Sequence, residues 1–395
     1  MGLGIYLHGF ALDCALGSSL DEITRNLEAL RAPGLGERTD LLLQGSVFVG
    51  QATAEGAALP PELAAYDSRN NRLLGAVLDE LDAEIKALID RYGPARVAAV
   101  TGTSTSGLDE ADKIVSSRAQ GSDYAPYRYN QQEIGDSAGY LKARYALQGP
   151  CYTVSTACSS TTRALISAVR LIKSAQCDAA LSGGADTLCR MPLNGFDSLQ
   201  LVSRTPCRPF SRDRAGITIG EAAGVALLSR ERAALEILGY GESSDAYHIS
   251  SPHPEGCGAK RAMEMALDMA GLNPEDIGYV NLHGTGSKLN DEVEAKIMHE
   301  LFGTQVPCSS TKYLTGHTLG ASGICEAVLC ALILTRSLSL PPQLCDSSPL
   351  DESLPECGLI TERIQLKRPI IMSNAFAFGG NNASIIIGLH QEGSA

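Results

Sequence analysis

Two helical segments that are apolar on nearly all faces constrain the fold of this chain more than any other feature. Residues 164–175 follow a Cys-Ser-Ser turn, and residues 324–337 follow a Gly-Ala-Ser-Gly turn. A helix that is apolar on nearly all faces should be buried on all sides. One such helix in each half of the chain is the pattern of a duplication. We place the seam near residues 230–240, which predicts an N-terminal half, 1–240, and a C-terminal half, 241–395.

Short β-rich runs alternate with helical stretches around these two segments, which favours an α/β fold. The expected strands include residues 97–100, 179–181, 279–282 and 385–387. The expected helices include residues 73–92, 159–175, 259–270, 291–302 and 324–337.

The charge balance excludes several classes of partner. Lys and Arg number 32 and Asp and Glu number 45, a formal charge of −13. Nucleic-acid binding and polybasic membrane binding both need a surplus of cations, so neither is expected. The chain has no uninterrupted run of 18 apolar residues and no basic leader with a cleavage site. We therefore expect no membrane span and no signal peptide.

The cysteines and glycine turns limit the cofactors. Twelve cysteines are scattered without a Cys-x-x-Cys pair, and the histidines show no ligand spacing. This argues against a disulfide scaffold and against a metal site, and it favours a reducing cytoplasm. Neither a P-loop nor a Rossmann glycine motif is present, so no bound nucleotide cofactor is expected.

Cys158 is the candidate nucleophile. A β-prone run, residues 152–154, leads into it and an apolar helix leads out. The thiol should therefore lie at the N-terminus of a buried helix, where the helix dipole lowers a thiol pKa. The alternative, a small buried cysteine without chemistry, suits most of the other cysteines, including Cys151.

Two histidines stand in glycine-lined turns. His283 directly follows a strand-like run in HGTGS, and His317 stands between Gly316 and Gly320 ahead of the second apolar helix. Catalytic groups often occupy such carboxyl ends of strands. Lys312 precedes His317 in the same loop, and Glu326 lies on the apolar helix that follows. A carboxylate on such a helix needs a partner, and Lys312 is the natural one.

Four ordered motifs resemble the elongating β-ketoacyl-acyl carrier protein synthases: TACSS at 156–160, HGTGS at 283–287, STKYLTGH at 310–317 and FGGNN at 378–382. GGADTL at 183–188, CRPFSRDRAG at 207–216 and GEAAG at 220–224 extend the resemblance along nearly the whole chain. Relatives that initiate synthesis use Cys-His-Asn and thiolases use a second Cys, whereas the third position here is His317. The resemblance implies the thiolase fold: two α/β halves in five alternating αβαβα layers, normally dimeric.

The resemblance also implies a mechanism. Cys158 would accept an acyl group from acyl carrier protein, and His283 and His317 would donate hydrogen bonds to the malonyl thioester that loses CO₂. The backbone N–H groups of Cys158 and Phe378 would form the oxyanion hole, in the turn that contains Gly379, with Phe378 as a gate. Further residues carried over are the supporting ion pair Lys312–Glu326 and the phosphopantetheine contacts Thr285 and Ser287.

Departures from the family pattern concern the substrate. The common Arg-Asp-Gly-Phe run is Arg214-Ala215-Gly216-Ile217 here, and Ser287 replaces the usual Thr. The stretch that surrounds this run is most similar to the ketosynthases of aryl polyene gene clusters. Side chains expected to line an acyl pocket, with ordinary core packing as the alternative, are Met191, Leu193, Phe196 and Leu199.

The expected partners are acyl carrier protein and a second synthase subunit. The dimer is either a homodimer or a heterodimer with a chain-length-factor-like subunit, and the chain could be active only with that subunit. A non-catalytic partner role is the weaker alternative, because such subunits usually lack the nucleophilic Cys. Carrier proteins are acidic, so docking onto this acidic chain requires a local basic patch and weakens as salt rises. The candidates for that patch are Arg69, Arg72, Lys142 and Arg208.

Overall fold

The computed structural model describes residues 4–121, 128–343 and 349–390. Its central feature is a sheet of ten strands in the order β11-β10-β14-β15-β9-β1-β8-β6-β4-β5. The first half contributes β1 (Tyr6–Asp13), β4 (Val97–Gly102), β5 (Cys151–Val154), β6 (Ala179–Asp186) and β8 (Ala222–Ser229). The second half contributes β9 (Leu235–Ser244), β10 (Tyr279–Asn281), β11 (Cys308–Ser309), β14 (Ile370–Ala377) and β15 (Asn381–Leu389).

The two halves have the same topology. If the five strands of each half are numbered along the chain, both read 3-2-4-5-1 from the outer edge inward. In both, the two innermost pairings are antiparallel and the two outermost are parallel. Only Tyr6 and Leu7 of β1 pair with β9, so the halves meet through a short contact. Residue 240, the expected boundary, lies inside β9.

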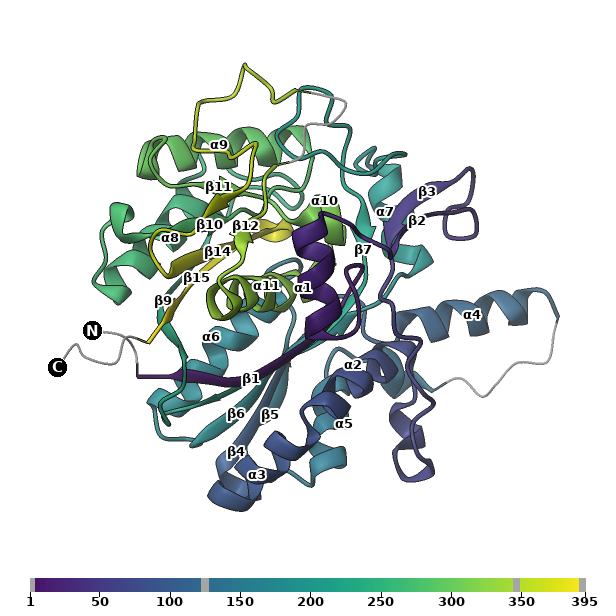
Figure 1. Cartoon of the computed structure of the whole chain (residues 1–395). Coiled ribbons are helices and arrows are strands. Elements are labelled where there is room, and N and C mark those ends of the chain that lie inside the picture. The colour runs from purple at the N-terminus through teal and green to yellow at the C-terminus, as the bar shows by residue number, and fades with distance from the viewer. Residues whose placement is uncertain (1–3, 122–127, 344–348, 391–395) are drawn as a thin grey trace.

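The layers follow from where apolar side chains go. One core cluster lies between the half-sheets and contains α6 (Ser160–Lys173) and α11 (Ser322–Arg336). A second lies under α2 (Arg69–Glu80), α3 (Asp82–Tyr92) and α5 (Asp136–Tyr145), and a third under α8 (Cys257–Ala270) and α9 (Lys288–Phe302). Figure 1 shows the resulting five layers, with α6 and α11 in the middle. The expected thiolase fold is confirmed.

Apart from short 3-10 helices, smaller elements complete the secondary structure of the described residues. They are the helices α1 (Leu20–Ala29), α4 (Leu108–Ala119), α7 (Arg190–Ser198) and α10 (Lys312–Thr315), and the strands β2 (Leu35–Arg38), β3 (Val47–Gly50), β7 (Ile219–Gly220), β12 (Ser339–Leu340) and β13 (Ile364–Gln365).

The two central helices differ in burial. Every residue of α11 from Ser322 to Leu334 is buried, as expected. Residues Leu319–Arg336 have a mean hydropathy of 1.6, long and apolar enough to cross a membrane by composition, but 89% of this stretch is buried inside the protein. Its apolar character therefore serves the core. Helix α6 instead keeps one polar stripe, where Arg163 and Arg170 pair with Glu242.

One helix prediction was wrong in detail. Residues 73–92 form two helices, because Leu81 leaves helical geometry at φ −107°, ψ 7°. The side chain of Leu81 is buried against the same core cluster as both helices. Tertiary packing therefore favours the break, and no glycine or proline marks it in the sequence.

Candidate active site

Cys158 lies at a sharp turn between β5 and α6. Ala157 has a left-handed backbone with φ 52°, an uncommon conformation for a residue with a side chain. The turn places Cys158 two residues ahead of α6 and buries its thiol. Strand β4 packs closely against this turn because residue 102 is glycine. A Cβ there would lie 2.6 Å from the backbone nitrogen of Thr161.

His317 is held beside this thiol by both central helices. Its Nε2 is 3.0 Å from Cys158 Sγ, and its Nδ1 is 3.0 Å from the hydroxyl of Ser322 at the start of α11. The two helices approach closely because position 323 is glycine. A Cβ there would lie 2.6 Å from the nitrogen of Thr162.

His283 reaches the same point from β10. Its ring centroid is 5.3 Å from that of His317, with the ring planes 87° apart. The carboxylate of Glu294 on α9 accepts the backbone N–H groups of His283 at 2.7 Å and Gly284 at 2.6 Å. Nδ1 of His283 is buried and has no hydrogen-bond partner among the described residues. Glu294 therefore fixes the loop and leaves the imidazole available to a bound molecule.

The predicted ion pair between Lys312 and Glu326 is present. Both side chains are buried, and Lys312 Nζ contacts Glu326 Oε1. Burial lowers the pKa of both His283 and His317 well below the ordinary value, and the nearby positive charge of Lys312 lowers it further. Both imidazoles are therefore neutral at physiological pH, so each has one N–H to donate.

The thiol departs from expectation. Burial raises the pKa of Cys158 to about 11, although Lys312 and the backbone N–H of Phe378 act in the opposite direction. The expected lowering by the helix start is therefore wrong, because desolvation outweighs it. At neutral pH the thiol keeps its proton, and the adjacent Nε2 of His317 is the group placed to receive it.

The turn after β14 brings a backbone N–H close to the thiol. The N–H of Phe378 points towards Cys158, as the resemblance implies. The N–H of Gly379 instead donates to the carbonyl of Ile249 at 2.7 Å, so Gly379 cannot contribute to an oxyanion hole. Its φ of 80° shapes the turn. The ring of Phe378 packs at 5.5 Å on that of Phe196.

A cavity of about 450 Å³ leads to these groups. It is lined by Cys158, His283, His317, Phe376 and Phe378, by Thr285 and Ser287, and by the apolar Phe196, Leu199 and Ile217. The hydroxyls of Thr285 and Ser287 lie 3.1 Å apart. All four residues of the divergent run 214–217 also line the cavity.

Comparisons with known proteins agree with this geometry. The family model for the β-ketoacyl synthase N-terminal domain matches residues 60–234, and that for the C-terminal domain matches residues 234–345. The ketosynthase ApeO of Xenorhabdus doucetiae, whose structure is solved in complex with its chain length factor ApeC, is 52% identical, with 98% of each chain covered and a TM-score of 0.97. This chain belongs to the β-ketoacyl synthase family.

Two further relatives are less similar to this β-ketoacyl synthase. The 3-oxoacyl-[acyl-carrier-protein] synthase 2 of Rhizobium meliloti is 35% identical over 67% of this chain, and the match spans 66% of that relative. The chain therefore covers slightly less than two thirds of this curated relative. The ishigamide ketosynthase/chain length factor is 26% identical, with 98% of this chain and 99% of that chain covered, at a TM-score of 0.86.

Two predicted acyl-pocket residues of this synthase lie elsewhere. Met191 is 61% exposed on α7 and does not line the cavity. Leu193 is fully buried in a small core cluster beside β3 and β7. Both lie on α7, as Phe196 does. The sequence alone does not reveal which face of α7 points into the cavity.

The predicted docking patch stays a prediction, and its residues lie away from the cavity. Arg69 pairs with the buried Glu221 and Arg72 with Asp67, so both stabilise the fold locally. Neither of them lines the active-site cavity, nor do Lys142 and Arg208. An exposed cation that does line it is Lys288, at the start of α9.

Several acids that organise the site were not predicted from the sequence. Besides Glu294, Asp291 accepts the N–H groups of Thr285 and Gly286. Asp186 accepts the N–H groups of Ser104, Thr105 and Ala321, so it joins loops from both halves. The spacing Asp-x-x-Glu after HGTGS was the available signal, since it puts both carboxylates at one end of α9.

The site also resembles a metal site in one respect. The donor atoms of Cys158, His283 and His317 lie within 4.8 Å of one another. The sequence shows no ligand spacing, because these three residues are far apart in the chain and come together only in the fold. Thiolate and imidazole are the ligands that zinc prefers.

Proposed function

We propose that this chain is a β-ketoacyl-acyl carrier protein synthase. It transfers an acyl group from a carrier protein to Cys158 and then extends it by two carbons through decarboxylative Claisen condensation with malonyl-carrier protein. The observation that carries this proposal is the approach of His317 Nε2 to Cys158 Sγ at 3.0 Å, with a second neutral imidazole beside it. This arrangement supplies a nucleophile, a proton acceptor and two N–H donors.

The first half-reaction forms the acyl-enzyme. Cys158 sulfur attacks the thioester carbonyl while its proton passes to His317 Nε2, and the carbonyl oxygen is stabilised by the N–H groups of Cys158 and Phe378. The carrier thiolate leaves and takes the proton from His317. One C–S bond forms and one breaks, so the transfer needs no other reactant.

The second half-reaction forms the carbon–carbon bond. Malonyl thioester loses CO₂, and the enolate oxygen accepts N–H hydrogen bonds from His283 and His317. The enolate carbon attacks the acyl-Cys158 carbonyl and the C–S bond breaks. The Cys158 thiolate then takes up one proton from solvent, which balances the negative charge that the malonyl carboxylate brought in before CO₂ left. His317 must accept at Nε2 in the first half-reaction and donate from it in the second. Ser322 permits both tautomers, because a hydroxyl can either donate to Nδ1 or accept from it.

The test of this function is an intact-mass experiment. We expect incubation with fatty-acyl and aryl-enoyl carrier proteins to add one acyl group, and malonyl-carrier protein then to release a product two carbons longer. Cys158→Ala should remove the adduct, and Cys151→Ala, seven residues earlier, should keep it. An adduct that survives in Cys158→Ala would refute the proposed nucleophile.

The pathway proposed for this synthase is aryl polyene synthesis with a chain-length-factor partner. The resemblance of residues 189–224 to aryl polyene ketosynthases supports the pathway. The 52% identity to ApeO, solved with its chain length factor, supports the partner. Strand β5 also ends the ten-stranded sheet, its outer edge pairs with no described strand, and Tyr152 on it is 37% exposed. Such an edge is a place for a second chain to pair. Light scattering of the chain alone and with a co-expressed partner tells a homodimer from a heterodimer.

Carrier docking is proposed at the cavity mouth. Lys288 is exposed there, next to Leu289, which is also exposed. We expect Lys288→Glu to raise the KM for malonyl-carrier protein, and the effect to shrink at high salt. Lys142→Glu is the matched control, because Lys142 is exposed on α5 and does not line the cavity. Equal effects of the two changes would refute this location.

A cytoplasmic location is proposed on chemical grounds. The nucleophilic thiol must stay reduced, and the cysteines that the structure describes are all free.

A further inference from the structure

A second cavity lies in the C-terminal half, outside the active site. It has a volume of about 630 Å³, within the range of about 300–1,000 Å³ typical of small-molecule sites. Its floor is the loops that precede β10 and β11, and its cover is the segment 350–360. The catalytic groups follow these strands, so this cavity lies at the opposite end of the half-sheet.

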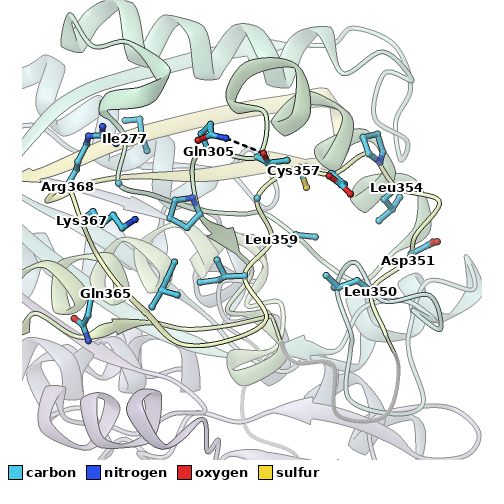
Figure 2. Close-up of a pocket in the computed structure, with 18 of the residues that line it drawn as sticks. Ile277, Gln305, Leu350, Asp351, Leu354, Cys357, Leu359, Gln365, Lys367 and Arg368 are labelled. Atoms are coloured by element: carbon cyan, nitrogen blue, oxygen red, sulfur yellow. Dashed lines mark hydrogen bonds between the residues drawn. The ribbon is translucent and has the colours of Figure 1, made fainter.

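The lining of this cavity is amphipathic. Figure 2 shows Lys367 and Arg368 on one side and Leu350, Leu354 and Asp351 on the other, with Leu359 between them. Ile277, Pro307, Ile360 and Ile364 add to the apolar wall. Lys367 and Arg368 are exposed, and neither forms an ion pair with a described residue. The acids of the lining, Asp351, Glu352 and Glu356, all belong to the covering segment 350–360, whereas both cations lie on the adjacent residues 367 and 368. The cavity therefore fits a molecule whose anionic end lies beside Lys367 and Arg368 and whose body is hydrocarbon.

The covering segment is attached directly to the active site. Asp351 accepts a hydrogen bond from Arg214 at 2.5 Å, and its backbone N–H donates to the Phe210 carbonyl at 2.9 Å. Arg214 is buried, lines the active-site cavity, and lies 3.9 Å from Asp291. Asp291 in turn accepts the backbone N–H groups of Thr285 and Gly286, and Thr285 is one of the two proposed phosphopantetheine contacts.

We propose that this cavity is a regulatory site for a medium-chain monocarboxylic acid. The carboxylate lies at Lys367 and Arg368, and the chain lies along Ile277, Pro307 and Leu359 towards Leu350. Its insertion displaces Leu350 and Asp351, which loosens the contact with Arg214 and weakens the binding of the phosphopantetheine arm. The site is distinct from the acyl site, so a free acid would act on the synthase without competing for Cys158.

Calorimetry with decanoate tests the site itself and needs no catalysis, so its result is independent of the proposed function. We expect one decanoate per chain, and no binding of decyltrimethylammonium, which has the opposite charge. Lys367→Glu/Arg368→Glu should weaken decanoate binding at least tenfold. Lys142→Glu/Lys173→Glu carries the same change in charge on exposed lysines elsewhere and should leave it within twofold.

Binding that survives reversal of Lys367 and Arg368, or that disappears once Cys158 is alkylated, would place decanoate in the active-site cavity and overturn the proposal. Kinetics test the coupling. Saturating decanoate should raise the KM for malonyl-carrier protein at least threefold and change kcat little. In Asp351→Asn, decanoate should still bind while its effect on KM disappears. Binding without any effect on KM would overturn the regulatory role.

Discussion

The buried pair of Lys312 and Glu326 makes the most specific prediction about stability. The two side chains are 1% and 2% exposed, and Oε2 of Glu326 has no hydrogen-bond partner among the described residues. Lys312→Met leaves the carboxylate without the counter-charge that Lys312 supplies. Removal of one partner from a buried pair costs about 3–5 kcal/mol, so we expect the Tm at pH 8 to fall by several degrees.

The pH dependence identifies the cause. Burial already raises the pKa of Glu326, and Lys312 opposes that rise, so the variant raises it further. Between the unfolded pKa of about 4.3 and this raised value, the folded state holds a proton that the unfolded state has lost. Stability of Lys312→Met should therefore fall as pH rises, by up to about 1.4 kcal/mol per unit.

Thermal unfolding of Lys312→Met and Lys312→Met/Glu326→Gln between pH 5.5 and 8.5 measures how the stability of each variant depends on pH. The double variant has no carboxylate to titrate, so we expect it to recover stability at pH 8 and to lose the pH slope. A single variant as stable as the parent at pH 8, or with no slope, would refute the electrostatic account. Both variants should also lose the charge that lowers the pKa of His283 and His317, which moves the acidic limb of the activity profile to higher pH.

Three further predictions concern the triad. Ser322→Ala removes the hydroxyl that hydrogen-bonds to His317 Nδ1, a bond worth about 0.5–1.5 kcal/mol, so malonyl decarboxylation should slow about 2- to 13-fold. Thr335→Val, which alters a hydroxyl at the far end of α11, should not slow it. Equal rates in the two variants would contradict the role of Ser322. Because burial raises the pKa of Cys158 to about 11, its alkylation by iodoacetamide should rise about tenfold per pH unit from pH 7 to 9.5, and a plateau below pH 8 would contradict this. Zinc should inhibit the condensation reversibly, and more strongly as pH rises, because zinc binding displaces the thiol proton of Cys158. Unchanged zinc binding in His283→Ala would exclude the triad as the zinc site.

Much of the fold was predictable because its signals are local. The segment 324–337, apolar on nearly all faces, indicated a buried helix, and the turns before Cys158 and after His283 mark strand ends. The break at Leu81 was not predictable, because tertiary packing favours it over helix propensity. The polar stripe of α6 was not predicted for a related reason, because Arg163 and Arg170 form ion pairs with Glu242 of the C-terminal half.

The site was predictable in its reactive groups and less so in their surroundings. Motif spacing identified Cys158, His283 and His317, but the pKa of the thiol depends on how deeply the fold buries it. Arg69 and Met191 show the same limit: a cation in the sequence does not reveal that Glu221 already binds it, and an apolar residue does not reveal which side of α7 it occupies.

Separate measurement of the two half-reactions in His283→Ala tests the central claim most directly. His317, and not His283, lies next to the thiol, whereas both imidazoles are assigned to the enolate. We predict acyl transfer to Cys158 within about threefold of the parent and CO₂ release from malonyl-carrier protein reduced about 10²- to 10³-fold, the usual loss for one oxyanion donor. Normal CO₂ release, or an equal loss in both half-reactions, would contradict the account.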